Sequence, residues 1–144
     1  YSVANLSISG ETTAGGRSRL GQALITYKPT IVVIALGAND GLRGLPLGQM
    51  RDNLNAMVDA SRAAGAKVVL AGMRLPPNYG PYATDFFVSF KGIAQSKKMP
   101  LVDFLLEPIA RKPQLFQSDN LHPLADAQPL ILDHVWPVIA PLLK

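Results

Sequence analysis

A short aspartate–histidine motif near the C-terminus contains the residue types that acid–base chemistry needs. Asp119 precedes His122 by three residues, in a segment that reads as a loop. At this spacing the carboxylate can fold back and accept the imidazole Nδ1–H, which leaves Nε2 free to act as a general base. Pro123 favours an extended backbone at His122 and so narrows the positions of the ring. On spacing alone, a solvated loop without chemistry is the more common explanation of such a pair.

Two further loops offer hydrogen-bond donors that could stabilise a developing negative charge. Gly10 follows an apolar stretch, and a glycine there lets backbone N–H groups face a ligand without interference from a Cβ atom. Asn39 follows a second apolar stretch, where its side-chain NH₂ can serve as an uncharged donor. Ordinary turn formation also explains both loops, because Gly, Asn and Asp all favour turns.

The remaining candidates for ligating or nucleophilic chemistry are few. His134 follows Asp133 in a segment with helical periodicity, and we predict that it lies on the surface. Two histidines this far apart make no metal site, so we expect neither a metal nor another cofactor. The absence of cysteine excludes disulfides, cysteine-ligated zinc, iron–sulfur clusters and thiol catalysis.

Short apolar runs predict the strands that would position these loops. Residues 31–36 and 67–73 are continuous and rich in β-branched side chains, as expected for parallel strands that are buried on both faces. Residues 100–104 form a third, shorter run. Residues 1–6 read as the middle of another strand.

Apolar side chains at helical spacing predict helices between and after these strands. The four apolar stripes lie within residues 20–27, 47–58, 83–93 and 131–142. Thr12 or Thr13 is a candidate N-cap for the first helix, and Pro46 and Gly65 suit the start and the end of the second. Pro137 is expected to kink the last helix. The alternation of strand and helix predicts an α/β fold with a parallel sheet, in which ligands bind beyond the carboxyl ends of the strands.

Composition narrows the class of protein. A chain of 144 residues favours a single domain spanning 1–144, and 48% hydrophobic with 17% charged residues is unlike a disordered chain. The formal net charge of +4 comes from scattered Lys and Arg, which argues against a nucleic-acid partner. The longest uncharged apolar stretch, 29–39, is too short for a transmembrane segment.

Taken together, the motifs resemble the SGNH (GDSL) hydrolase family. Gly10, the sequence Gly37-Ala38-Asn39-Asp40 and the Asp119/His122 pair occur in the order of that family's blocks II, III and V. The neighbouring sequence is similar to the bacterial thioesterase, lysophospholipase and arylesterase branch. The matching stretches are residues 5–12, 37–44, 74–80, 121–123 and 126–129.

The resemblance implies a fold and a set of roles. The fold is a three-layer α/β/α, flavodoxin-like parallel sheet, and the reaction is hydrolysis of a small carboxylic ester or thioester. Asp119 and His122 are the implied catalytic residues, with Gly10 and Asn39 in the oxyanion hole. Apolar residues on the same loops could bind the acyl chain: Leu42, Leu45, Pro77, Tyr79 and Leu121. A periplasmic or secreted location is implied by resemblance only.

The family's first block, a strand followed by Gly-Asp-Ser-Leu with the nucleophilic serine, does not occur in these residues. No G-x-S-x-G elbow replaces it. We therefore expect the domain to lack its first strand and helix, with the serine on a missing N-terminal fragment that would be the chain's own partner. The isolated chain is then predicted to be inactive, and not to fold alone in the family's form.

Other functions stay open at this stage. The absent nucleophile fits a relative that binds acyl or carbohydrate ligands without catalysis, and a carbohydrate acetyl esterase is a further enzymatic alternative. A flavodoxin-like nucleotide or receiver module is disfavoured, because the sequence has no Gly-rich phosphate loop and no acidic pair after its first strand.

Overall fold

A computed structural model of the chain describes residues 1–143. A three-stranded parallel sheet lies at its centre, in the spatial order β1-β2-β3. The strands are β1 (Ile31–Ile34), β2 (Lys67–Ala71) and β3 (Leu101–Val102). All three apolar runs thus form strands as predicted, although each strand is shorter than its run.

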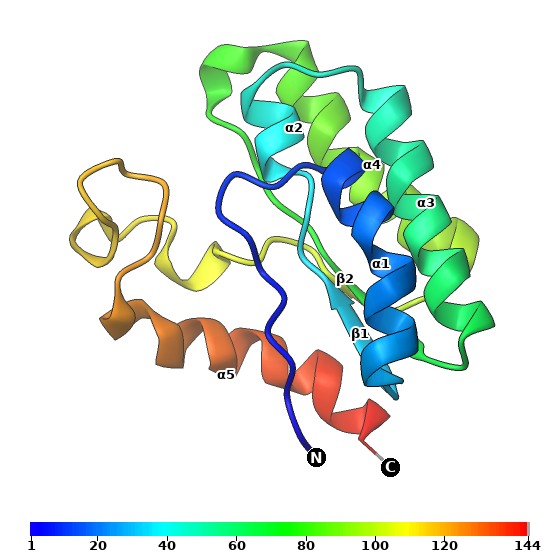
Figure 1. The fold of residues 1–144 in the computed structure, drawn as a ribbon. Coiled ribbons are helices and arrows are strands. Elements are labelled where there is room, and N and C mark those ends of the chain that lie inside the picture. The colour runs from blue at the N-terminus through cyan, green and yellow to red at the C-terminus, as the bar shows by residue number, and fades with distance from the viewer. Residues whose placement is uncertain (144) are drawn as a thin grey trace.

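Five α-helices surround the sheet (Figure 1). They are α1 (Thr13–Tyr27), α2 (Ala38–Leu42), α3 (Leu47–Ala63), α4 (Pro81–Lys97) and α5 (Gln128–Ile139). Short 3₁₀ turns cover Pro77–Tyr79, Glu107–Ile109, Pro113–Leu115, Ala125–Ala127 and Ala140–Leu142. Two predicted helix ends are present. The Thr12 side chain caps α1 by accepting a hydrogen bond from Gly15 N–H, and Gly65 follows α3 with φ of 87°. No helix within residues 1–143 has the length and hydropathy that crossing a bilayer requires.

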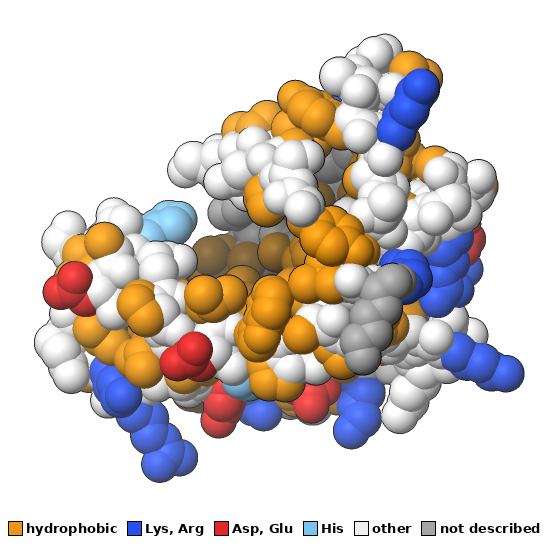
Figure 2. All heavy atoms as spheres, turned by 90° about the horizontal axis from the view of Figure 1, so that it is seen from below, with side chains coloured by type: hydrophobic (Ala, Val, Ile, Leu, Met, Phe, Trp, Pro, Cys, Tyr) orange, Lys and Arg blue, Asp and Glu red, His pale blue; other side chains and the backbone are white. Residues whose placement is uncertain are grey.

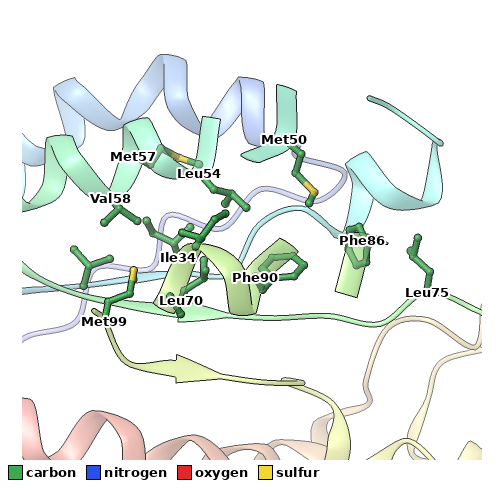
Figure 3. Packing of buried hydrophobic residues seen from close by; sticks show 13 residues of the cluster. Ile34, Met50, Leu54, Met57, Val58, Leu70, Leu75, Phe86, Phe90 and Met99 are labelled. Carbon is green, nitrogen blue, oxygen red and sulfur yellow. The ribbon is translucent and has the colours of Figure 1, made fainter. Parts of the chain in front are cut away.

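Successive side chains of β2 point to opposite faces of the sheet and so join two separate cores. Val68 and Leu70 point to the core beneath α3 and α4, where Phe86 and Phe90 of α4 meet edge-to-face with ring centroids 5.2 Å apart (Figure 3). Burying each such side chain stabilises the fold by about 1.5–3 kcal/mol. Val69 instead joins the core on the opposite face, which α5 covers. The helices therefore form layers on both sides of the sheet, as the α/β/α expectation requires.

The outer strand β1 is less buried than its sequence predicts. Val33 is 46% exposed, although the apolar run containing it was expected to be buried on both faces. Val33 is in register with Val69, so it faces the side of the sheet that α5 covers. The prediction is wrong here because β1 is an edge strand within residues 1–143 and the helix layer on this side does not reach it. The residues of α5 that cover the sheet pack against Val69, Ala71 and Val102, not against β1.

The N-terminal segment does not form the predicted strand. Residues 1–10 are exposed, and none of residues 1–8 has regular secondary structure. The segment (dark blue in Figure 1) passes α5 and runs to one side of β1 and β2. It is held by the Tyr1 hydroxyl, which donates to Leu143 O, and by Arg19, which donates to Leu6 O. A strand needs a partner for its backbone N–H and C=O groups, and this segment pairs with none in residues 1–143.

Candidate active site

Asp119 and His122 form the contact that their spacing predicts. Asp119 Oδ2 lies 2.5 Å from His122 Nδ1. An ionised carboxylate can only accept a hydrogen bond, so the proton of this contact belongs to Nδ1. The imidazole Nε2 makes no hydrogen bond within residues 1–143. Both side chains are exposed, at 62% for His122 and 41% for Asp119.

The loop that carries this pair is organised by its own backbone. Phe116 and Pro123 form an isolated antiparallel bridge, and Gln117 N–H donates to His122 O at 2.8 Å. Asn120 sits at the tip with φ of 57°, a left-handed conformation that asparagine tolerates. The loop therefore positions the histidine without help from distant elements.

Asp119 is held in its ionised form by donors from the same loop. Its second oxygen, Oδ1, accepts the backbone N–H groups of His122 at 3.0 Å and of Leu121 at 2.9 Å. The backbone N–H of His122 contributes most, followed by its imidazole and the Leu121 N–H, and together they lower the pKa of Asp119 to about 2. The carboxylate therefore stays charged at neutral pH and favours the Nδ1–H tautomer.

Gly10 and Asn39 lie on two neighbouring segments, before α1 and after β1, that are hydrogen-bonded to each other. Asn39 Nδ2 donates to Glu11 O at 2.9 Å. Gly10 has φ of 78° in a turn closed by Glu11 N–H and Ile8 O, a conformation that favours glycine. The Gly10 N–H has no acceptor among residues 1–143, and one amide hydrogen of Asn39 remains beyond its bond to Glu11. Both groups can therefore still donate to a ligand.

Asn39 lies in a short helix rather than in a simple turn. The segment Ala38–Leu42 forms α2 directly after Gly37, which has φ of 118°. Turn chemistry explains Gly37 but not the helical residues after it. With five residues, including Asn, Asp and Gly, this helix has little intrinsic propensity, so tertiary contacts must hold it.

Asp40 is a buried charged residue whose importance sequence reasoning missed. It is only 4% exposed, and its carboxylate accepts the Thr13 N–H at 2.9 Å and the Thr13 hydroxyl at 2.6 Å. The available signal was its place directly after Asn39, but partners 27 residues apart leave no local pattern.

The five predicted apolar residues divide into packed and exposed members. Leu42, Leu45 and Tyr79 are half-buried, whereas Pro77 and Leu121 are exposed. The Tyr79 hydroxyl donates to Leu42 O at 2.8 Å, and the hydroxyl of Tyr82, which was not predicted, donates to Leu45 O at 2.6 Å. Burial raises the pKa of Tyr82, with Asp40 and Tyr79 adding to the effect, so its hydroxyl remains a donor.

The site residues thus form two groups that no hydrogen bond joins within residues 1–143. The loop carrying Asp119 and His122 (orange in Figure 1) lies apart from the turn carrying Gly10 (dark blue). Viewed from below, the surface is hollowed, with hydrophobic side chains in the hollow and a histidine side chain at its rim (Figure 2). Such a concave, largely apolar surface is the usual setting for a small-molecule site.

His134 is not the surface residue that its sequence context predicted. It is half-buried, with Nε2 2.9 Å from Phe104 O. The prediction is wrong because α5 packs across the segment that follows β3, which the helical pattern did not reveal. Residues 1–143 contain no group of three or more His, Asp or Glu that could hold a metal ion.

Comparison with known proteins gives consistent results. Residues 1–128 match the model of the GDSL-like lipase/acylhydrolase family. The chain is 48% identical to Esterase TesA of Pseudomonas aeruginosa, over 99% of this chain and 72% of that protein. It is 42% identical to an arylesterase of Vibrio mimicus, over 92% and 67% of the two chains. It is 39% identical to the thioesterase 1/protease 1/lysophospholipase L1 of Escherichia coli, over 99% of this chain and 69% of that protein.

The solved structure of TesA has the same fold. It superposes with a TM-score of 0.95, covering 99% of this chain and 80% of TesA. Because the relatives are named as esterases and thioesterases, a function in ester hydrolysis follows at the level of the family. The chain therefore belongs to the GDSL-like lipase/acylhydrolase family, as its motifs predicted.

Proposed function

We propose that this chain supplies the base and the oxyanion donors of an esterase that uses a Ser-His-Asp triad. The hydrogen bond between Asp119 and His122 carries the proposal, because it fixes one tautomer and leaves Nε2 free to take a proton. In the reaction, a serine hydroxyl attacks the carbonyl carbon of an ester or thioester while His122 accepts the hydroxyl proton. His122 then returns that proton to the leaving alcohol or thiol.

The negative charge that develops on the carbonyl oxygen needs donors that are already in place. Gly10 N–H and the remaining amide hydrogen of Asn39 are suitable, since both lie on the loops joined by the bond from Asn39 to Glu11. Water then repeats the sequence on the acyl-serine, with His122 as base, and releases the acid. Removing one such donor typically costs about 10²–10³ in kcat.

The serine, we infer, comes from a segment outside these 144 residues. None of the eight serines donates a hydrogen bond to His122 within residues 1–143. A strand that pairs with the open edge of β1 would place a residue beside the loops at the carboxyl end of the sheet.

The acyl group would lie against Leu42, Leu45, Pro77, Tyr79 and Leu121. These apolar residues support short- or medium-chain esters and thioesters as substrates, and the relatives are named as an esterase, an arylesterase and a thioesterase/lysophospholipase.

Turnover of p-nitrophenyl butyrate tests the proposal directly. The complete polypeptide should hydrolyse this ester, and replacing its Gly-Asp-Ser serine with alanine should abolish turnover. The 144-residue chain alone should show no turnover above the uncatalysed rate. Full activity of this chain alone would contradict the external nucleophile.

One observation favours a second candidate, a non-catalytic ligand-binding protein: no nucleophile is hydrogen-bonded to His122 within residues 1–143. The same assay separates the two functions. A complete polypeptide that binds an acyl ligand but leaves p-nitrophenyl butyrate intact would favour the binding protein.

A further inference from the structure

We propose that Asp40 is a positioning residue that holds the two oxyanion donors in one geometry. It acts through Thr13 and Asn39 and does not touch the reacting atoms. The inference rests on the proposed roles of Gly10 and Asn39, and extends them to a buried carboxylate that lies behind the site.

Two adjacent residues of α2 bind two nearby residues of the Gly10 loop. Asn39 Nδ2 donates to Glu11 O at 2.9 Å, and Asp40 accepts from Thr13 N–H at 2.9 Å. Since both attachments flank Thr12, the backbone from Glu11 to Thr13 cannot slide or rotate relative to α2 without breaking one of them. Gly10 directly precedes this fixed stretch, so the orientation of its N–H relative to α2 is fixed as well.

Burial makes the attachment at Asp40 strong. Asp40 is 4% exposed and Thr13 is fully buried, so neither partner can exchange the other for water without opening the structure. Hydrogen bonds to an ionised acceptor are shorter and stronger than those between neutral groups, in keeping with the 2.6 Å contact from the Thr13 hydroxyl.

A chain of donors ends on this carboxylate. Arg17 donates to Asn53 Oδ1, Asn53 Nδ2 donates to Thr13 Oγ1, and the Thr13 hydroxyl donates to Asp40. Because Asn53 belongs to α3, the chain links three helices behind the Gly10 loop. Each donor polarises the next towards the negative charge. Thr13 is also the first residue of α1, so the carboxylate lies at the positive end of that helix.

A double-mutant cycle in the complete, serine-containing protein tests this role. The four proteins are the unsubstituted enzyme, Asn39→Ala, Asp40→Asn and the double variant. Asn39→Ala should lower kcat by about 10²–10³. Asp40→Asn keeps one oxygen acceptor but presents an NH₂ group to one of the two Thr13 donors, and should lower kcat by about 10–100-fold, with KM changed by less than about threefold.

The decisive quantity is the cost of Asp40→Asn once Asn39 is absent. Because Asp40 is proposed to align both donors, the second substitution should then misalign only Gly10, and it should lower kcat by clearly less than Asp40→Asn does in the unsubstituted enzyme. Equal costs in both backgrounds would overturn the positioning role while leaving the oxyanion role of Asn39 intact. If Asn39→Ala itself leaves kcat unchanged, the proposed oxyanion hole fails, and the positioning role fails with it.

Folding is controlled within the same experiment. Rates are divided by the folded fraction from circular dichroism, which removes a purely structural loss. Thr13→Val keeps the backbone donor and the shape of the side chain but deletes one hydrogen bond to Asp40, so it should give a smaller loss of kcat in the same direction. Asp59→Asn is the matched control, because it removes a carboxylate on the exposed face of α3, paired with Lys97, and should leave kcat unchanged. If Asp40→Asn does not fold, an unchanged kcat for Thr13→Val overturns the proposal.

Discussion

The two halves of the candidate site are held in place by different means. The donor half, with Gly10 and Asn39, is built on buried contacts between residues far apart in sequence, such as the bond from Thr13 to Asp40. The base half, with Asp119 and His122, is exposed and organised by hydrogen bonds within one loop. The proposed oxyanion donors are thus fixed by contacts with the core, whereas the proposed base is fixed by hydrogen bonds within its own loop.

This contrast predicts that substitutions in the base half reduce activity with little loss of stability, whereas substitutions in the donor half also destabilise the fold. The largest effect is expected for His122→Ala in the complete protein, which should lower kcat on p-nitrophenyl butyrate by about 10⁴ or more. Its urea midpoint should stay unchanged, because the exposed ring packs against nothing in the core. His134→Gln is the control, and it should retain most of the activity. A His122→Ala variant within tenfold of full activity would contradict the base assignment.

In the donor half, we expect substitutions to lower the stability of the folded protein. Asp40→Ala leaves two buried donors of Thr13 without an acceptor, and should reduce the free energy of unfolding by about 2–4 kcal/mol in urea titrations. Asp119→Ala removes a carboxylate with a similar number of hydrogen bonds, but these are exposed, so its urea midpoint should fall less than that of Asp40→Ala. Similar midpoint losses for the two variants would remove the distinction between core-held and loop-held residues.

The hydrogen bonds of the base half can be measured by titration. In ¹³C NMR the side-chain carboxyl of Asp119 should titrate near pH 2, below its ordinary value of 3.8. Because the folded pKa is lowered, the loop contacts are fully present above pH 3.8 and are lost as the pH falls through about 2. In His122→Ala the pKa should rise, since the imidazole donor is gone, but the backbone donors should keep it below 3.8. A midpoint near 3.8 in the unsubstituted protein would contradict the described loop.

The same contrast explains which parts of the site could be predicted from sequence. The Asp119–His122 contact spans three residues, so a local pattern could suggest the pairing, although on spacing alone a solvated loop was the more common explanation. The Asp40–Thr13 contact spans 27 residues and depends on how α1 packs beside α2, which no local pattern encodes. The Asp40–Thr13 contact is therefore visible only in the folded structure, whereas the Asp119–His122 pair has a local sequence pattern.

The fold itself shows a similar division. Runs of β-branched residues located β1 and β2, because buried parallel strands need them at nearly every position. Residues 1–6 read as a strand but have only one β-branched residue and no strand partner within residues 1–143. The helix α2 was missed because Asn, Asp and Gly are poor helix formers. Composition therefore predicts what a segment can form, and its neighbours decide whether it does.

The smallest expected effect concerns substrate choice in the base half. Leu121 is 43% exposed directly beside His122, so it can contact an acyl chain without contributing to the core. Leu121→Ala should lower kcat/KM for an octanoyl ester about 3–10-fold more than for an acetyl ester, because only the longer chain loses apolar contact. Leu124→Ala, an equally apolar change on the same loop at 38% exposure, should affect both esters alike. Equal losses for Leu121→Ala would mean that this leucine only packs the loop, and the acyl site would then have to lie with Leu42, Leu45 and Tyr79 in the donor half.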